Sequence, residues 1–306
     1  MQDIHTIVVV YQFGKVASTS VVNAINSAPG FHAIQSHLLG ADCLMRVVPY
    51  ICDPNTSDYA AQVEFDQLSA AFTTTRMLNQ VRDGTGPRKR FVLVTLVREP
   101  LSWFRSAILQ DLPRYMVLFR GIGRTLELGD PEAEADALSA CLLVALRWLS
   151  EVAERIEDLA NIQWGDHRLK AAVDDVVPKD LHHEFLSLFF VMIRPLRWFD
   201  THYTSATGIT LTEFQPYRRG MWKRDPDWVN AYLIRYEDLQ EGYLALRDDL
   251  GLPAEAVLPQ DNVSATKPHS QPAAQAFSSG EADRLRRTLG RCDYARFFGY
   301  RQPAQT

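Results

Sequence analysis

Two short segments of this sequence combine the residue types that bind phosphate-like anions. The first is Gly14-Lys-Val-Ala-Ser-Thr-Ser20, where small residues precede three hydroxyl side chains. Backbone N–H groups of such a loop and of a following helix can point at an anion, and the Lys15 ammonium adds a charged donor. The second segment begins at Arg98, whose guanidinium suits bidentate contact with a phosphate. Both segments therefore predict local anion-binding sites.

The first segment lacks the spacing of a Walker A motif. That motif places Lys directly before the Ser or Thr that binds Mg²⁺, whereas Lys15 precedes Ser18 by three positions. A turn followed by a helix N-cap is the simpler alternative for the same residues. The metal ligand of a nucleoside-triphosphate kinase is therefore not predicted at this loop.

The elements around these segments follow from hydrophobic patterning. Strands are expected over 7–11, 31–36, 91–97 and 231–236, and helices over 19–26, 101–110, 135–160, 196–206 and 243–250. The apolar run 185–193 fits either a buried strand or a buried helix. The alternation of strands and helices predicts an α/β fold with a mostly parallel, doubly wound sheet and helices on both faces. In such a sheet, ligands bind at the carboxyl ends of the strands, where both segments lie.

The two segments together resemble one enzyme family. The first resembles the 5′-phosphosulfate loop of sulfotransferases that use 3′-phosphoadenosine-5′-phosphosulfate (PAPS), and is closest to the carbohydrate and capsular-polysaccharide sulfotransferases. The stretch Val94 to Ser106 resembles the family's 3′-phosphate motif, in which an Arg at a strand end and a Ser eight residues later bind the 3′-phosphate. Leu233-Ile-Arg-Tyr-Glu-Asp-Leu239 resembles a structural segment that follows a late strand in many members. The resemblance implies a P-loop-like fold. The length of the chain, without a linker or low-complexity tract inside it, predicts a single domain over residues 1–306.

The donor site implied by this resemblance has three parts. The loop that would hold the 5′-phosphosulfate consists of Gly14, Lys15, Val16, Ala17, Ser18, Thr19 and Ser20. The 3′-phosphate would bind Arg98 and Ser106, and a late segment that would close over the nucleotide contains Asn262, Ser264 and Lys267. Gly14 and Ala17 stand where the commoner family pattern has Pro and Gly, a departure that affects the path of the loop. Residues 111–190 match no motif of the family, so the acceptor pocket is not assigned.

The resemblance implies transfer of a sulfuryl group from PAPS to an acceptor hydroxyl. Like phosphoryl transfer, this reaction depends on positioning and charge neutralisation, and Lys15 would stabilise the charge that develops on the leaving nucleotide. No metal is expected, because the leaving group is a good one. The acceptor is expected to be a carbohydrate, either a capsular or extracellular polysaccharide or a glycosylated small molecule. The alternatives are a P-loop kinase or NTPase and a non-catalytic nucleotide-binding module in polysaccharide synthesis.

His37 is the candidate general base. It directly follows the second expected strand, which places it at the carboxyl edge of the sheet beside the loop, while His32 should lie at the opposite edge. A base with a pKa near neutrality suits removal of a hydroxyl proton, and family members often use a His or Glu as base. A His that caps the next helix or binds a loop carbonyl is an equally weighted alternative. The competing histidines are His182, His183, His202 and His269.

Bulk composition is that of a folded globular chain. The sequence has 306 residues, of which 46% are hydrophobic and 23% charged, and its net charge is −5, so no nucleic-acid partner is predicted. Its apolar stretches are shorter than the roughly 20 residues that span a bilayer. Four cysteines without paired spacing indicate free thiols in a reducing compartment. We therefore expect a cytoplasmic protein without a membrane span.

Overall fold

The computed structural model describes residues 4–40, 58–86, 89–225, 228–259 and 269–300. The chain divides into two compact units, a sheet unit drawn from 1–98 and 198–262 and a helical unit drawn from 99–197 and 263–306. The prediction of one domain over residues 1–306 stays a prediction. In the described stretches, no helix is both long enough and apolar enough to cross a membrane.

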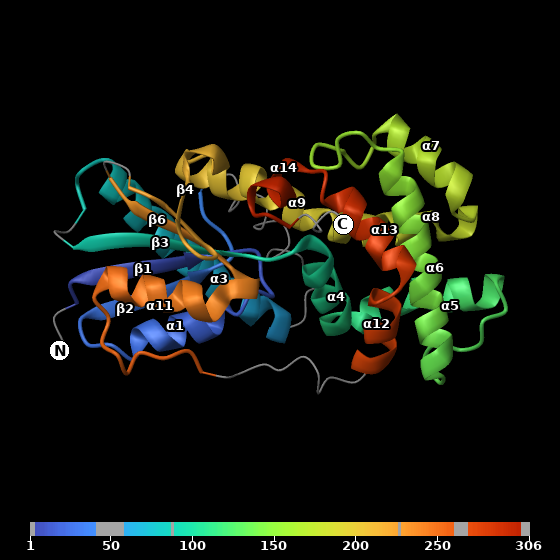
Figure 1. Cartoon of the computed structure of the whole chain (residues 1–306), viewed down its shortest axis with the longest axis horizontal. Helices are drawn as coiled ribbons and strands as arrows, with labels where there is room; N and C mark the ends of the chain where they lie inside the picture. Colours follow the sequence, from blue (N-terminus) through green and yellow to red (C-terminus); the bar gives the residue numbers. More distant parts are fainter. Residues whose placement is uncertain (1–3, 41–57, 87–88, 226–227, 260–268, 301–306) are drawn as a thin grey trace. The chain divides into compact units, whose positions relative to one another are not determined.

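The sheet unit contains one mixed sheet, and its described strands run in the order β2-β1-β3-β6-β5-β4 (Figure 1). Their bounds are β1 Thr6–Tyr11, β2 Phe31–Ser36, β3 Arg90–Val97, β4 Gln215–Arg218, β5 Met221–Arg224 and β6 Asn230–Arg235. β2, β1, β3 and β6 are parallel, whereas β5 and β4 are antiparallel additions at one edge. The predicted α/β fold with a mostly parallel sheet is thus confirmed.

The sheet unit also contains helices, which lie between or after these strands in the chain (Figure 1). They are α1 Ser18–Asn26, α3 Asp58–Arg82, α10 Ser205–Thr207 and α11 Leu239–Leu250, with a π-helix at Phe199–Thr204 and 3₁₀ turns at Leu211–Glu213 and Tyr236–Asp238. The chain moves from β1 outward to β2, then returns past β1 to β3. Because such crossovers are right-handed, the two connections place α1 and α3 on opposite faces of the sheet. The direction of travel therefore reverses between β1 and β3, which is where α/β sheets bind ligands.

The central strands are β-branched runs that the helices bury on both faces. Val8, Val9 and Val10 of β1 are fully buried, as are Val92 to Val94 of β3. Such uniform burial is typical of parallel strands inside an α/β fold. It leaves the strand ends as the only positions from which β1 and β3 can present polar residues to a ligand.

The helical unit follows β3 directly. Its helices are α4 Pro100–Gln110, α5 Leu112–Thr125, α6 Ala135–Glu154, α7 His167–Val176, α8 His182–Met192, α12 Ser270–Phe277, α13 Gly280–Leu289 and α14 Asp293–Phe297, with a 3₁₀ turn at Lys179–Leu181; α9 Arg194–Trp198 ends at the boundary with the sheet unit. The Glu99 side chain caps α4 by accepting from the backbone N–H groups of Leu101 and Ser102 at 3.1 and 2.6 Å. With Pro100 at the first helical position, this cap ends the extended segment just after Arg98.

Three sequence expectations are refined in this region. The run 185–193 is helical as far as Met192, and in the folded chain its buried side chains are Phe185, Leu188, Phe189 and Met192. Helix α6 ends at Glu154, earlier than position 160, and Ile156 and Leu159 are buried from the loop that follows. The helix expected over 196–206 is interrupted by the π-helical segment.

The described cysteines are free thiols. Cys141 is buried and Cys292 is half-buried. Burial raises the pKa of each thiol to about 11, so both are protonated at neutral pH. Cys43 and Cys52 lie outside the described residues.

Candidate active site

The loop between β1 and α1 has a strained backbone. Its φ angles are 90° at Gly14, 59° at Lys15 and 61° at Ala17, while φ at Val16 is not positive. A left-handed conformation is uncommon for residues that carry a Cβ, and residues held this way cluster at functional sites. Left-handed residues in a short loop can turn successive N–H groups toward one concave side, the geometry of an anion nest, and three of the four residues 14–17 have positive φ.

Helix α1 begins directly after this loop. Its N-cap residue is Ala17, which provides no side-chain hydrogen bond to the first turn. The N–H groups of the first turn therefore remain available at the positive end of the helix dipole. Ser18 and Ser20 are buried, whereas Thr19 is exposed and donates to the Gln35 amide oxygen at 3.3 Å. The predicted loop residues 14–20 thus gather at the carboxyl end of β1.

Replacing Ala17 with Gly should stabilise the protein. The left-handed conformation costs a residue with a Cβ about 1 to 2 kcal/mol, and the greater freedom of an unfolded Gly offsets about 0.5 to 1 kcal/mol of that relief. We expect the free energy of unfolding, measured by urea denaturation, to rise by up to about 1 kcal/mol. Gly14→Ala is the matched control, because no atom lies within 4 Å of the added Cβ and any loss reports backbone strain alone. A destabilised Ala17→Gly protein would contradict the strained loop.

Arg98 lies beside the same loop. It directly follows β3, whose last residue Val97 pairs with Arg235 of β6. Arg98 and Tyr236, the residues that follow these two, are therefore neighbours. The Arg98 guanidinium carbon is 4.2 Å from the centre of the Tyr236 ring, and its Nη1 donates to the Lys15 carbonyl oxygen at 2.8 Å. A carbonyl and an aromatic face therefore hold this guanidinium at the point where β1 and β3 end.

His37 lies on the other side of β1. In the parallel pair β1–β2, Tyr11 is opposite Ser36, so Gln12 and His37 leave their strands side by side. His37 Nδ1 is 3.1 Å from Gln12 Nε2 and 3.2 Å from the Gln12 carbonyl oxygen, and His37 Nε2 is 3.3 Å from Gln35 Nε2. His32 is exposed near the opposite end of β2. The ring is thus at the predicted edge, and its catalytic role stays a prediction.

The remaining predicted residues are distributed over both units. Ser106 is half-buried on α4 of the helical unit. His182 Nε2 contacts the Val177 carbonyl oxygen at 2.8 Å, a contact that ties this ring to its own loop. Asn262, Ser264 and Lys267 lie outside the described residues. Within the described chain, no three or more His, Cys, Asp or Glu side chains are grouped so as to hold a metal ion.

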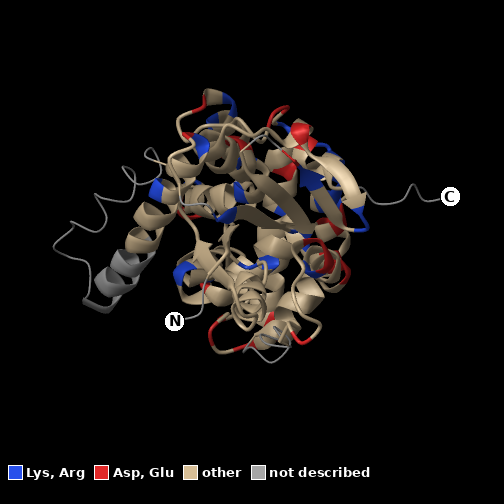
Figure 2. Ribbon diagram, turned by 90° about the vertical axis from the view of Figure 1, so that its left-hand side faces the viewer, with Lys and Arg blue, Asp and Glu red and all other residues tan. Residues whose placement is uncertain are grey.

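The basic residues that follow Tyr217 are all paired with carboxylates. The shortest ion pair of each is Arg218 with Asp248, Arg219 with Glu241, Lys223 with Asp249 and Arg224 with Glu213, at 3.6, 3.2, 3.2 and 2.7 Å. Figure 2 shows basic and acidic positions intermixed over the described ribbon in that view. This run is therefore a charge-balanced surface of the sheet unit and not an anion site.

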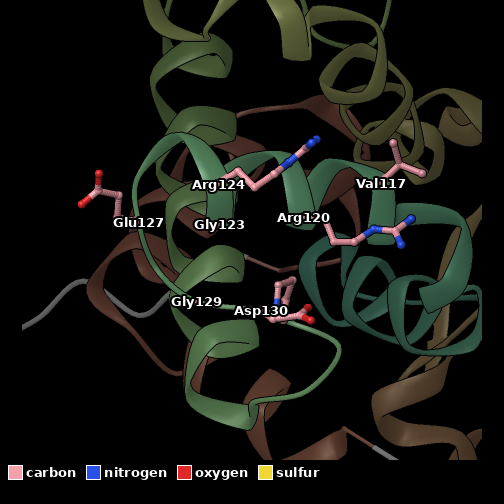
Figure 3. A pocket seen from close by; sticks show the side chains of 8 residues that line it. Val117, Arg120, Gly123, Arg124, Glu127, Gly129 and Asp130 are labelled. Carbon is pink, nitrogen blue, oxygen red and sulfur yellow. The ribbon is translucent and has the colours of Figure 1, made fainter.

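A separate pocket of about 630 Å³ lies in the helical unit, at the end of α5 and the loop that follows (Figure 3). Arg120 and Arg124 are one helical turn apart and extend toward the same side as the Asp130 carboxylate, whereas Glu127 points away. Arg120 also pairs with Glu132 at 3.5 Å. These groups could bind a polar ligand that carries both hydroxyl and acidic groups. None of the predicted site residues that the structure describes lines this pocket.

Two residues of the site, Gln12 and Gln35, have no counterpart in the sequence motifs, and both contact His37. Tyr236, which contacts Arg98, lies in the segment 233–239, for which only a structural role was expected. A usable signal existed for Gln12, which follows the first strand as directly as His37 follows the second. Residues that leave neighbouring parallel strands at the same level meet, but only the register of the folded sheet shows that these two do so.

No family model matches this chain, and neither the curated proteins nor the solved structures compared with it include a match. The function proposed below therefore rests on the motifs of the sequence and on the geometry of this site.

Proposed function

We propose that this protein is a sulfotransferase that moves a sulfuryl group from PAPS to a carbohydrate hydroxyl. The observation that carries the proposal is the bond between the two motifs, in which Arg98 donates to the Lys15 carbonyl at 2.8 Å. These residues are 83 positions apart in the chain, and only the parallel pairing of β1 and β3 brings them together. A donor with two phosphate groups requires two neighbouring anion-binding groups, and the strained loop 14–20 and the Arg98 guanidinium supply such a pair.

In the proposed donor complex, the N–H groups of residues 14–20 bind the 5′-phosphosulfate, and Arg98 binds the 3′-phosphate. Ser106 on α4 would supply a hydroxyl to the same phosphate, and the late segment with Asn262, Ser264 and Lys267 would cover the nucleotide. The finer fold class, a P-loop-like doubly wound domain, is part of this proposal. A cytoplasmic location is proposed on the composition of the chain alone.

The proposed reaction is an in-line displacement at sulfur. The acceptor oxygen forms a new S–O bond while the S–O bond to the 5′-phosphate of the donor breaks, and the electron pair of that bond stays on the leaving phosphate. The acceptor proton passes to His37. Because negative charge grows on the bridging oxygen, the Lys15 ammonium stabilises the transition state more than it stabilises the bound substrate.

Arg98→Ala should weaken binding of adenosine 3′,5′-bisphosphate far more than binding of adenosine 5′-monophosphate. Only the first nucleotide has the phosphate that Arg98 contacts in this proposal. Loss of such a charge-assisted contact costs about 1.5 to 3 kcal/mol, which is about a tenfold to 150-fold rise in Kd. Isothermal titration calorimetry with both nucleotides measures the difference.

Arg90→Ala is the matched control for this measurement. Arg90 begins β3 and is exposed, while Arg98 follows the other end of the same strand. Arg90 lies seven residues before Val97 along the strand, about 23 Å at the usual rise. Its removal should leave the binding of both nucleotides unchanged. Equal weakening of the two nucleotides by Arg98→Ala counts against a 3′-phosphate site.

A direct titration separates the proposed function from its alternatives. A P-loop kinase or NTPase binds ATP with Mg²⁺ more tightly than adenosine 3′,5′-bisphosphate, whereas a PAPS-dependent enzyme shows the reverse preference. A non-catalytic nucleotide-binding module binds adenosine 3′,5′-bisphosphate but transfers no ³⁵S-sulfate from labelled PAPS to any member of a panel of oligosaccharides. Transfer to an oligosaccharide would establish the reaction class and identify the acceptor together.

A further inference from the structure

A buried amide joins the anion loop to His37. Gln12 follows β1 and has no exposed surface. Its Oε1 accepts a hydrogen bond from the Gly14 N–H, and its Nε2 lies 3.1 Å from His37 Nδ1. One side chain therefore contacts both the first residue of the strained loop and the imidazole ring.

The two ends of this amide differ in chemistry, and this difference decides where His37 carries its proton. An amide oxygen only accepts and an amide NH₂ only donates, so the bond from Gly14 turns the oxygen toward the loop and the NH₂ toward His37. Nδ1 must then offer its lone pair, and the proton of the neutral ring is on Nε2. The backbone carbonyl oxygen of Gln12, 3.2 Å from Nδ1, would instead favour a proton on Nδ1.

The bond from Gly14 decides between these two arrangements. A proton on Nδ1 could be donated to the Gln12 carbonyl, but the Gln12 NH₂, 3.1 Å from Nδ1, would then lose the lone pair that it faces. Turning the amide over to avoid this would set its NH₂ against the Gly14 N–H. A buried donor that faces another donor loses its hydrogen bond without compensation. The amide therefore keeps its orientation for as long as the Gly14 N–H donates to it.

Gln35 can adjust to either state of the ring. Its amide lies 3.3 Å from His37 Nε2 at one end and 3.3 Å from the Thr19 hydroxyl at the other. The Thr19 hydroxyl can donate or accept, so either end of the Gln35 amide can face the ring. Of these two amides, Gln12 is the one whose orientation is fixed, so Gln12 is the one that favours a single tautomer.

We infer that Gln12 is a positioning residue that holds His37 with its proton on Nε2 until a phosphate binds at Gly14. The change of tautomer when a phosphate binds at Gly14 rests on the proposed function. A phosphate oxygen is a stronger acceptor than an amide oxygen and takes the Gly14 N–H. The released amide turns its oxygen toward His37, the ring moves its proton from Nε2 to Nδ1 by exchange with water, and Nε2 gains the lone pair that a base needs. Donor binding thereby converts His37 into a base.

The proton position can be read directly by NMR. Protein labelled with ¹⁵N-histidine is measured in alkaline buffer, where the imidazole is neutral, and two-bond ¹H–¹⁵N correlations distinguish the two tautomers. His37→Asn identifies the His37 signals among the 8 histidines. We expect a pyridine-like Nδ1 in the protein alone and a pyrrole-like Nδ1 after saturation with adenosine 3′,5′-bisphosphate. A pyrrole-like Nδ1 before nucleotide is added, or a signal that bound nucleotide leaves unchanged, would overturn the inference.

Two variants isolate Gln12 from the rest of the site. Gln12→Glu places an oxygen at both ends, so Nδ1 should carry a proton with and without nucleotide, and the nucleotide-induced shift should be lost. Gln35→Met is the matched control, in which the wild-type shift should persist. If Gln12→Glu does not fold, the wild-type titration and Gln35→Met still decide the question. If calorimetry detects no nucleotide binding, the proposed function fails, while the ligand-free spectra of wild type and Gln12→Glu still test the role of Gln12.

Discussion

Replacing Lys15 with Ala should lower turnover about 10²-fold to 10³-fold while changing the affinity for adenosine 3′,5′-bisphosphate far less. The charge that the ammonium neutralises grows in the transition state, and removal of one such electrostatic contact typically costs this much in kcat. The backbone geometry should survive, because Arg98 bonds the carbonyl oxygen of Lys15 and not its side chain. Single-turnover rates with labelled PAPS and calorimetry with the product nucleotide measure the two effects.

Lys15→Met is the matched variant for this prediction. Its side chain has a similar length and no charge, so it should lose as much turnover as Lys15→Ala. A Met variant that retains most of the rate would show that packing of the side chain matters and not its charge. If turnover of both variants stays within a factor of a few, Lys15 only helps to bind the donor.

Replacing His37 with Ala or Gln should lower turnover about 10²-fold to 10⁴-fold with saturating donor and remove the acidic limb of the pH profile. A general base works in its deprotonated form, so the rate of the wild type falls as pH decreases through the pKa of that base. A variant without the base has no such group to protonate, and its slower rate should not show that fall. Initial rates between pH 5 and 9 measure the profile.

His32→Ala is the control for this experiment. His32 lies on the same strand, near the opposite edge, and is exposed. Its removal should leave both the rate and the profile unchanged. If the His37 variants keep the acidic limb and most of the rate, the base is another residue, and His202 of the sheet unit becomes the next to test.

Much of the sheet could be predicted from local pattern. The runs over β1 and β3 are rich in β-branched residues and apolar on both faces. Such runs are typical of parallel strands that helices cover on both sides. The end of β3 could also be predicted, since Glu99 and Pro100 begin a helix directly after Arg98. The edge of the sheet at which Lys15, His37 and Arg98 lie follows from these two facts.

Other features depended on partners far away in the chain. The basic run after Tyr217 is paired with Asp248, Asp249 and Glu213, carboxylates that lie against it only in the folded chain. The apolar run 185–193 had no decisive period, and its burial inside the helical unit made it a helix. A short apolar segment takes the structure that its neighbours can cover.

The sequence by itself determined which residues stand at strand ends and which of them can bind anions, because strand period, helix capping and loop composition act over a few residues. Only the tertiary structure decided which of those residues touch. The register of β1 with β2 sets Gln12 against His37, and the register of β3 with β6 sets Arg98 against Tyr236. Register is fixed by the packing of side chains between strands that are distant in sequence, so no local pattern contains it.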